Sequence, residues 1–336
     1  MSARNMRRSL VCAAFLLAAS TAWCDDDQDP STPPASTSPT VSRRPRMAGS
    51  STGYIDDAIV GSEVRFRFDA DWDLQNPDRA EFFYAKCGCY RNGPNPLDPN
   101  APGPGPGVAK SVNLQELQLR IEYAPNHRLS VFVETPVRWI QFQPVPNSGN
   151  LANGTGLGDV RAGFKYAVLA SENRYLTFQF RTYFPSGDAL RGLGTNHYSV
   201  EPTILYYQRF GQRLAISSEF GDWHPIGGSS SAGLPVAPTG FAGDILIYGV
   251  GAAYDVIRKE TYTVTPVLEF VGWSILSGLV TGGNVPSTGG VTIANMKIGA
   301  RLTTGVHNSF YAGYGRELTT SSWYTNIARF EYRFVF

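Results

Sequence analysis

The sequence lacks the features by which most membrane proteins are recognised. After residue 24 it has no apolar run close to the roughly 18 residues that a membrane-spanning helix needs. Charged residues make up only 17% of the 336 residues and the net charge is +1, so charge gives no reason to expect nucleic acid as a partner. If the chain crosses a membrane, it must do so as a closed β-barrel, the other structure that satisfies its backbone hydrogen bonds in lipid.

Cysteine is also scarce, with four in the chain. Cys87 and Cys89 form a C-x-C pair, and no set of four ligands at zinc spacing accompanies them. In an oxidising compartment we expect these two cysteines to form a loop-stabilising disulfide; a metal site or a link to a partner are the alternatives. No nucleotide-binding glycine loop followed by a helix is present, so neither a cofactor nor a bound metal is expected.

Aromatic residues and glycine are abundant instead. The chain has 6 Trp, 17 Tyr, 19 Phe and 35 Gly, a combination that fits strands and turns better than helices. The last eight residues alternate strictly, with one aromatic face (Phe330, Tyr332, Phe334, Phe336) and one charged face (Arg329, Glu331, Arg333). Closing strands of bacterial outer-membrane barrels have this pattern and end on Phe. We therefore expect contact with outer-membrane lipid, and recognition by the barrel-assembly machinery through the strand that ends at Phe336.

The first part of the chain reads as a targeting segment and a tail. Residues 1–24 combine a basic start, a short apolar run and small residues near Ala22, which predicts a signal peptide. Residues 25–53 have too few apolar side chains to fold and are predicted to be a disordered periplasmic tail. The barrel is predicted to occupy residues 54–336. Whether residues 48–61 fold into its lumen as a plug is left open.

The connections between strands alternate in length. Twelve strands are predicted, at about 62–72, 112–124, 129–140, 158–169, 174–184, 198–208, 213–223, 245–256, 261–271, 292–303, 309–318 and 323–336. Tight turns such as residues 125–128 and 171–173 alternate with loops of a dozen residues or more, as in outer-membrane barrels. The fold class predicted is therefore all-β, a transmembrane antiparallel up-and-down β-barrel of about 12 strands in the cell outer membrane.

Nearly every predicted strand sends a charge to the face opposite its apolar one, which in a barrel is the lumen. In strand 112–124 we expect this parity to slip at a bulge near Gln115 and Glu116, before Arg120 and Glu122. Because the signs balance and twelve strands enclose little space, a narrow or partly blocked pore is expected. The residues predicted to line the lumen are Arg65, Arg67, Glu134, Arg138, Asp159, Arg161, Lys165, Arg181, Glu201, Glu219, Glu269, Lys297, Arg301, Arg329, Glu331 and Arg333.

Two motifs carry a family resemblance. Residues 154–166 read GTGLGDVRAGFKY, and residues 181–188 read RTYFPSGD. The first resembles the G-L-G-D-x-x-x-G-x-K-Y strand of the transporter-like outer-membrane family named after the meta-cleavage pathway of phenol degradation, and the second resembles the P-[ST]-G-D loop that follows. The resemblance implies an outer-membrane barrel that lets small hydrophobic or aromatic solutes cross. The motifs also have a purely structural reading, as a device for strand pairing and turns.

The function expected is therefore a narrow passive channel or transporter for a small apolar solute, and not an enzyme. One alternative is a structural or adhesive barrel with a closed lumen. The other is an outer-membrane lipid hydrolase, because His197-Tyr198-Ser199 resembles the His-x-Ser pair of outer-membrane phospholipase A. In that enzyme the pair faces lipid, whereas here it shares its parity with Glu201, which is predicted to face inward.

Overall fold

The structure, a computed structural model, describes residues 49–74, 109–144, 153–188, 192–195, 197–226, 243–278 and 289–336. Every regular element in these ranges is a strand. No helix among the described residues is long and apolar enough to cross a membrane. The predicted pair Cys87 and Cys89 lies outside the described residues.

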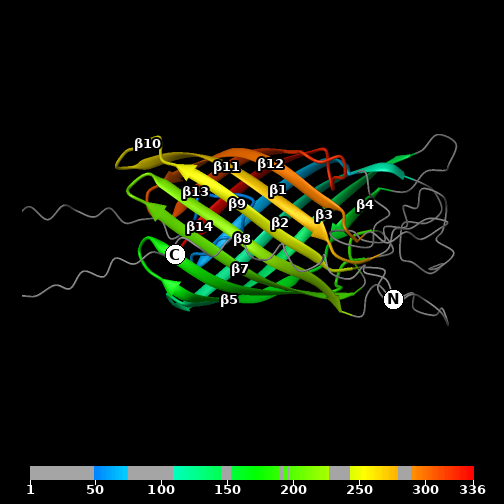
Figure 1. Cartoon of the computed structure of the whole chain (residues 1–336), viewed down its shortest axis with the longest axis horizontal. Helices are drawn as coiled ribbons and strands as arrows, with labels where there is room; N and C mark the ends of the chain where they lie inside the picture. Colours follow the sequence, from blue (N-terminus) through cyan, green and yellow to red (C-terminus); the bar gives the residue numbers. More distant parts are fainter. Residues whose placement is uncertain are drawn as a thin grey trace, which may run out of the picture. The chain divides into compact units, whose positions relative to one another are not determined.

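The strands form one antiparallel sheet in which neighbours in the chain are neighbours in space (Figure 1). They are β1 (Glu63–Leu74), β2 (Ala109–Asn126), β3 (Leu129–Pro144), β4 (Gly154–Leu157), β5 (Arg161–Ala170), β6 (Arg174–Tyr183), β7 (Tyr198–Phe210), β8 (Leu214–Ile226), β9 (Ile245–Tyr254), β10 (Ile257–Arg258), β11 (Tyr262–Ile275), β12 (Thr292–Thr304), β13 (Asn308–Glu317) and β14 (Asn326–Val335).

Twelve of these strands make the closed wall. β4 and β10 are short pieces that pair only with β3 and β11. The other strands follow one another around the sheet, and the first closes on the last, with Glu63 opposite Val335 and Trp72 opposite Asn326. The prediction of a twelve-stranded antiparallel up-and-down barrel is confirmed.

Alternation along each strand separates a lipid face from a lumen face. On β14, Phe330 is 58% exposed and Phe334 is 37% exposed, whereas Arg333, which lies between them in the sequence, is 1% exposed. In a closed barrel the exposed face points to lipid and the buried face to the interior. The charged side chains at alternate positions of the strand therefore face the lumen.

The bulge predicted near Gln115 and Glu116 is wrong. β2 pairs without interruption with β3 from Ser111 to Tyr123, and with β1 from Leu114 to Glu122. The inward parity does not slip; its chemistry changes, from the charged Glu122, Arg120 and Glu116 to the apolar Leu114 and Val112, all of them buried. The sequence pattern suggested a slip because apolar residues were assumed to face lipid along the whole strand.

One end of the barrel carries the tight connections. β2–β3, β5–β6, β7–β8 and β12–β13 are each joined by two or three residues, and Gly211 and Gly305 in two of these turns have positive φ angles of 58° and 61°. The C-terminus lies at the same end as β10 (Figure 1), where the N–H of Phe336 donates to the carbonyl of Ser62. Short turns are periplasmic in outer-membrane barrels, so β1 starts and β14 ends at the periplasmic side.

Candidate functional site: the barrel lumen

The residues predicted to line the lumen are buried in the structure, except Arg67, which is half-buried. Acids and bases from neighbouring strands pair across this inner wall. Arg120 contacts Glu122 and Glu134 at 2.6 Å each, and Arg329 contacts Asp69 at 2.6 Å. Pairing of this kind offsets the high cost of removing charges from water, and it fixes the position of each side chain.

A segment of chain that is not part of the wall occupies the lumen. Residues 49–61, here called the plug segment, precede β1, and their Thr52, Ile55 and Ala58 are 2%, 3% and 2% exposed. The segment closes on itself, because the N–H of Ser50 donates to the carboxylate of Asp57 at 2.7 Å. Its first five residues, 49–53, fall in the stretch that the sequence analysis assigns to the periplasmic tail.

One wall carboxylate holds the tip of the plug segment. Glu269 on β11 accepts hydrogen bonds from three successive backbone N–H groups, those of Gly53, Tyr54 and Ile55, at 3.1, 2.9 and 3.0 Å. It also accepts from the hydroxyl of Tyr311 at 3.1 Å. Hydrogen bonds to a charged group contribute about 1.5–3 kcal/mol each, so this one side chain is a principal anchor of the segment.

Wall arginines hold the carbonyl groups of the same segment. Arg301 donates to the carbonyl of Thr52 at 2.9 Å, and Arg329 donates to that of Gly53 at 2.6 Å. The centroid of the Tyr54 ring lies 3.9 Å from Lys297 Nζ and 4.1 Å from Arg329 Cζ. The plug segment is therefore held by polar and cation–π contacts along its whole tip.

Asp56 joins the plug segment to the opposite wall. Its backbone N–H donates to Glu219 on β8 at 2.9 Å, and its carboxylate accepts from Arg181 at 2.6 Å and from Gln179 at 2.8 Å, both on β6. Burial alone would raise the pKa of the Asp56 carboxyl, but the guanidinium of Arg181, with those of Arg120 and Arg65, holds that pKa well below its usual range.

The wall is hollowed where the plug segment lies against it. Gly249 and Gly251 occupy successive inward positions on β9. A Cβ atom on Gly251 would lie 2.9 Å from Thr52 Cγ2 and 3.1 Å from Ile55 Cδ1, and one on Gly249 would lie 3.2 Å from Ile55 Cγ1. The absence of side chains here makes the room that the plug segment fills.

The two motifs quoted for the family meet in space. The carboxylate of Asp159 accepts from the N–H of Gly187 at 3.0 Å, and from the N–H and hydroxyl of Thr195 at 2.8 and 2.7 Å. Ser186 is bonded to the same stretch, since its hydroxyl donates to the carbonyl of Gly158 at 3.2 Å. The motifs therefore tie the connection between β6 and β7 to the residues between β4 and β5, and the neighbouring Leu193 of that connection is 1% exposed.

A cavity of about 140 Å³ remains in the lumen beside the tip of the plug segment. Aromatic side chains and charges line it together, among them Tyr54, Asp56, Arg181, Tyr183, Glu219, Trp223, Trp273, Lys297 and Tyr324. Toward the extracellular end the inner wall becomes an apolar cluster, which includes Leu114, Ile140, Trp223, Trp273 and Tyr324. A volume of this order holds one small aromatic ring.

The His197 and Ser199 pair lies on the inner side of the wall. His197 is 5% exposed and Ser199 is 0% exposed, and the ring Nδ1 of His197 lies 2.8 Å from the carbonyl oxygen of Thr195. The ring of His197 also packs edge-on against Trp223, with the ring centroids 5.8 Å apart. The pair therefore faces away from the lipid that a lipid hydrolase has to reach.

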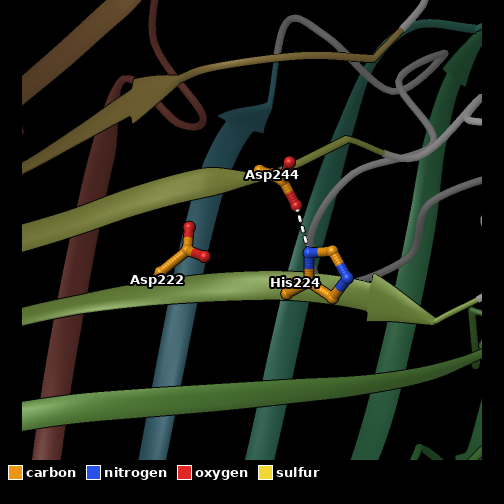
Figure 2. Close-up of side chains that lie close together, drawn as sticks. All are labelled: Asp222, His224 and Asp244. Carbon is orange, nitrogen blue, oxygen red and sulfur yellow. Dashed lines mark hydrogen bonds and ion pairs between the residues drawn. The ribbon is translucent and has the colours of Figure 1, made fainter.

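One cluster on the outer face has the composition of a metal site. Asp222 and His224 project from the lipid-side parity of β8, and Asp244 reaches His224 from the start of the neighbouring strand β9 (Figure 2). The Nδ1 of His224 lies 2.5 Å from a carboxylate oxygen of Asp244, and the ligand atoms of all three lie within 4.8 Å of one another. Two carboxylates and one imidazole could hold a divalent cation. Sequence analysis missed the cluster, because Asp244 is 20 residues from His224.

Sequence analysis also missed several groups of the lumen. Asp71, Glu116 and Gln179 lie on inward parities, and none of them was assigned to the site. The plug segment itself carried no strand pattern to reveal it. The two glycines at successive inward positions of β9 are the one signal in the sequence that could have indicated space set aside for another segment.

The chain is similar to several solved structures. The chain is similar to the crystal structure of an outer membrane channel from Pseudomonas putida F1, with 16% identity and a TM-score of 0.47, over 82% of this chain and 96% of that one. It is similar to the NanC porin, with 8% identity and a TM-score of 0.43, over 82% and 100%. It is also similar to the β domain of the Bordetella autotransporter BrkA, with 13% identity and a TM-score of 0.48, over 82% and 100%.

Likeness at these scores says nothing about cargo. No curated protein matches the chain in sequence. A family model does match, that of the family described as "Putative MetA-pathway of phenol degradation", over residues 118–221. This range contains both motifs on which the resemblance was based, so the predicted resemblance is confirmed.

Proposed function

We propose that this protein is a passive outer-membrane channel for small solutes, with a lumen that the plug segment closes at rest. The observation that carries the proposal is the way in which residues 49–61 are held. Their backbone is bonded to Glu269, Arg301 and Arg329, and water can replace each of these bonds when the segment leaves. A segment held by exchangeable polar contacts is suited to reversible closure.

The shape of the wall supports a channel over a structural barrel. A barrel that only needs to be sealed can fill its lumen with its own side chains, as small barrels do. In this barrel Gly249 and Gly251 leave part of the wall bare, and a separate segment fills the space. The structural alternative remains the second candidate, because the described lumen residues are extensively paired with one another.

The lining of the lumen supports a solute with an aromatic or apolar part. Tyr54 of the plug segment lies over Lys297 and Arg329, and the cavity beside it is lined by Trp223 and Trp273. A solute ring could take the place of the Tyr54 ring against the same two cations. The proposal contains no catalytic step, and the inward position of His197 and Ser199 offers no support for a lipid hydrolase.

The test is single-channel conductance of refolded barrels in planar bilayers. Three chains are compared: residues 25–336, the same chain without residues 49–61, and a matched control without residues 25–48, which keeps the plug segment. We expect discrete current steps to be rare for the first and third chains and frequent for the second. Silence from all three, with heat-modifiable gel mobility showing a folded barrel, would overturn the channel and favour the structural barrel.

A further inference from the structure

Asp56 binds to the wall through one hydrogen-bond donor, its backbone N–H, and one acceptor, its side-chain carboxylate. Its N–H donor meets the carboxylate of Glu219 at 2.9 Å, while its own carboxylate meets Arg181 at 2.6 Å and Gln179 at 2.8 Å. The nitrogen and the carboxyl carbon of this residue are separated by two carbon atoms, Cα and Cβ. The wall therefore presents a carboxylate, that of Glu219, and a guanidinium–amide pair, that of Arg181 and Gln179. The distance between them matches the distance between the nitrogen and the carboxylate of a small amino carboxylate.

The carboxylate of Glu219 accepts a hydrogen bond from the plug segment, from the N–H of Asp56. Among the described residues, no Lys or Arg nitrogen forms an ion pair with its carboxylate, which is buried and 9% exposed. Arg181 differs, because it also pairs with Glu134 and Glu201 on the wall. When the plug segment leaves, the carboxylate of Glu219 loses its N–H partner and becomes accessible to a donor from a solute. A cationic donor from a solute would compensate for that loss.

The cavity extends this site toward the aromatic side chains of the lumen. Asp56, Arg181 and Glu219 line it together with Tyr183 and Trp223, and its volume is about 140 Å³. A substituent that enters this space meets rings and the apolar cluster beyond them. The space is large enough for one small aromatic ring.

We propose that Glu219, Arg181 and Gln179 form a binding site in the channel for a small zwitterionic amino carboxylate with an aromatic or apolar substituent, and that Asp56 of the plug segment occupies this site at rest. The ammonium group of the solute binds Glu219, its carboxylate binds Arg181 and Gln179, and its substituent occupies the cavity beside Trp223. This inference rests on the proposed function, since solute and plug segment compete for the same groups.

The first test uses β-phenylalanine, which has this spacing and an aromatic ring, on the chain without residues 49–61. We expect it to interrupt the single-channel current, while 3-phenylpropanoate, which lacks the amine, and 1-phenylethylamine, which lacks the carboxylate, do so at least about 10-fold less at equal concentration. Glu219→Gln should weaken the interruption about 10-fold, because one charged hydrogen-bonding pair is lost. Ser217→Ala, at the neighbouring inward position of β8, is the matched control and should leave it unchanged.

The second test measures competition in the full-length barrel by isothermal titration calorimetry with β-phenylalanine. Asp56→Ala should bind it at least about 10-fold more tightly than the natural sequence, because an occupant that must first leave lowers the apparent affinity. The two proposals fail separately. Silence of the shortened chain overturns the channel, whereas a conducting shortened chain that does not distinguish β-phenylalanine from its two one-ended analogues, or that responds equally after Glu219→Gln, overturns the binding site alone.

Discussion

Asp159 and Thr195 are joined by two hydrogen bonds although they lie 36 residues apart: the N–H and the hydroxyl of Thr195 both donate to Oδ2 of Asp159, at 2.8 and 2.7 Å. Asp159 belongs to the first family motif, and its other oxygen accepts from Gly187 of the second motif. The two motifs therefore act together to fold one connection of the barrel inward. This contact supports the structural reading of the motifs that the sequence analysis left open.

Asp159→Ala removes the shared acceptor of this contact. Because two backbone N–H groups lose their partner in a buried place, we expect the folded barrel to lose about 2–4 kcal/mol of stability. The amides of Gly187 and Thr195 should also exchange hydrogen faster, which mass spectrometry of the detergent-solubilised protein can measure. Asp188→Ala, an exposed residue of the same connection, is the control. Equal exchange in both variants would contradict the role given to Asp159.

Glu269→Gln weakens the anchor of the plug segment without changing its size. The neutral amide offers one acceptor oxygen in place of a carboxylate, and its NH₂ group faces N–H donors. We expect the fraction of time that the full-length channel is open to rise at least about 10-fold, since loss of one charged hydrogen bond corresponds to about 1.5–3 kcal/mol. Single-channel recording measures this fraction. Glu260→Gln, in an exposed turn, should behave like the natural sequence.

Gly251→Ala fills the hollow of the wall. The added Cβ would lie 2.9 Å from Thr52 and 3.0 Å from Glu269 Cγ, so the plug segment must move. We expect more frequent openings in the full-length protein. In the chain without residues 49–61 the same substitution should change the number of openings little, because only the Glu269 side chain, which is then released from the plug segment, lies against the methyl group. An increase of the same size in both backgrounds would mean that the substitution acts on the barrel wall instead.

Acid should release the plug segment, but only at low pH. The pKa of Asp56 is held below its usual value in the folded state, so its ionised form stabilises the bound segment above the pKa of a free aspartate, about 3.9. That stabilisation is lost as the pH falls through the lowered pKa. Openings of the full-length channel should therefore increase below about pH 4. The chain without residues 49–61 controls for the titration of wall carboxylates.

Phe336 tests the proposed recognition by the assembly machinery. Its ring is 59% exposed and stacks on Phe334, with centroids 6.3 Å apart, at the periplasmic end of the barrel. Phe336→Ala should lower the amount of protein in the outer membrane several-fold in cells. The purified variant should still refold in detergent, because an exposed side chain contributes little to the packing of the barrel. Loss of refolding in the purified variant would assign Phe336 to stability instead.

Period-two alternation made the wall predictable from the sequence. Phe330 and Arg333 could be assigned to opposite faces because neighbouring side chains on a strand point in opposite directions. The same reasoning failed for Leu114 and Val112, which are apolar and yet face the lumen. Hydropathy distinguishes faces only when the lumen is polar, and the extracellular end of this lumen is not.

Strand alternation could not decide whether a segment before the first strand plugs the lumen, for a different reason. Residues 49–61 form no strand, and their contacts with Glu269 and Arg301 connect positions more than 200 residues apart. A bond from a backbone N–H to a distant carboxylate leaves no pattern in the sequence, since any residue but proline can supply the donor. Of the proposed solute site, Glu219 and Arg181 were predicted to face inward, but their relation to Asp56 depends on the closed barrel.

The position of the plug segment also constrains the order in which this protein folds. Its tip is bonded to Arg329 on the last strand of the chain and to Glu269 on β11, so its binding site is incomplete until the final hairpin has been added. Contacts between the two ends of a chain close the largest loop and form late. Closure of the lumen is thus coupled to completion of the barrel. In a barrel that stalls before β14 joins β1, the plug segment would lack its contact with Arg329 and the lumen would stay open.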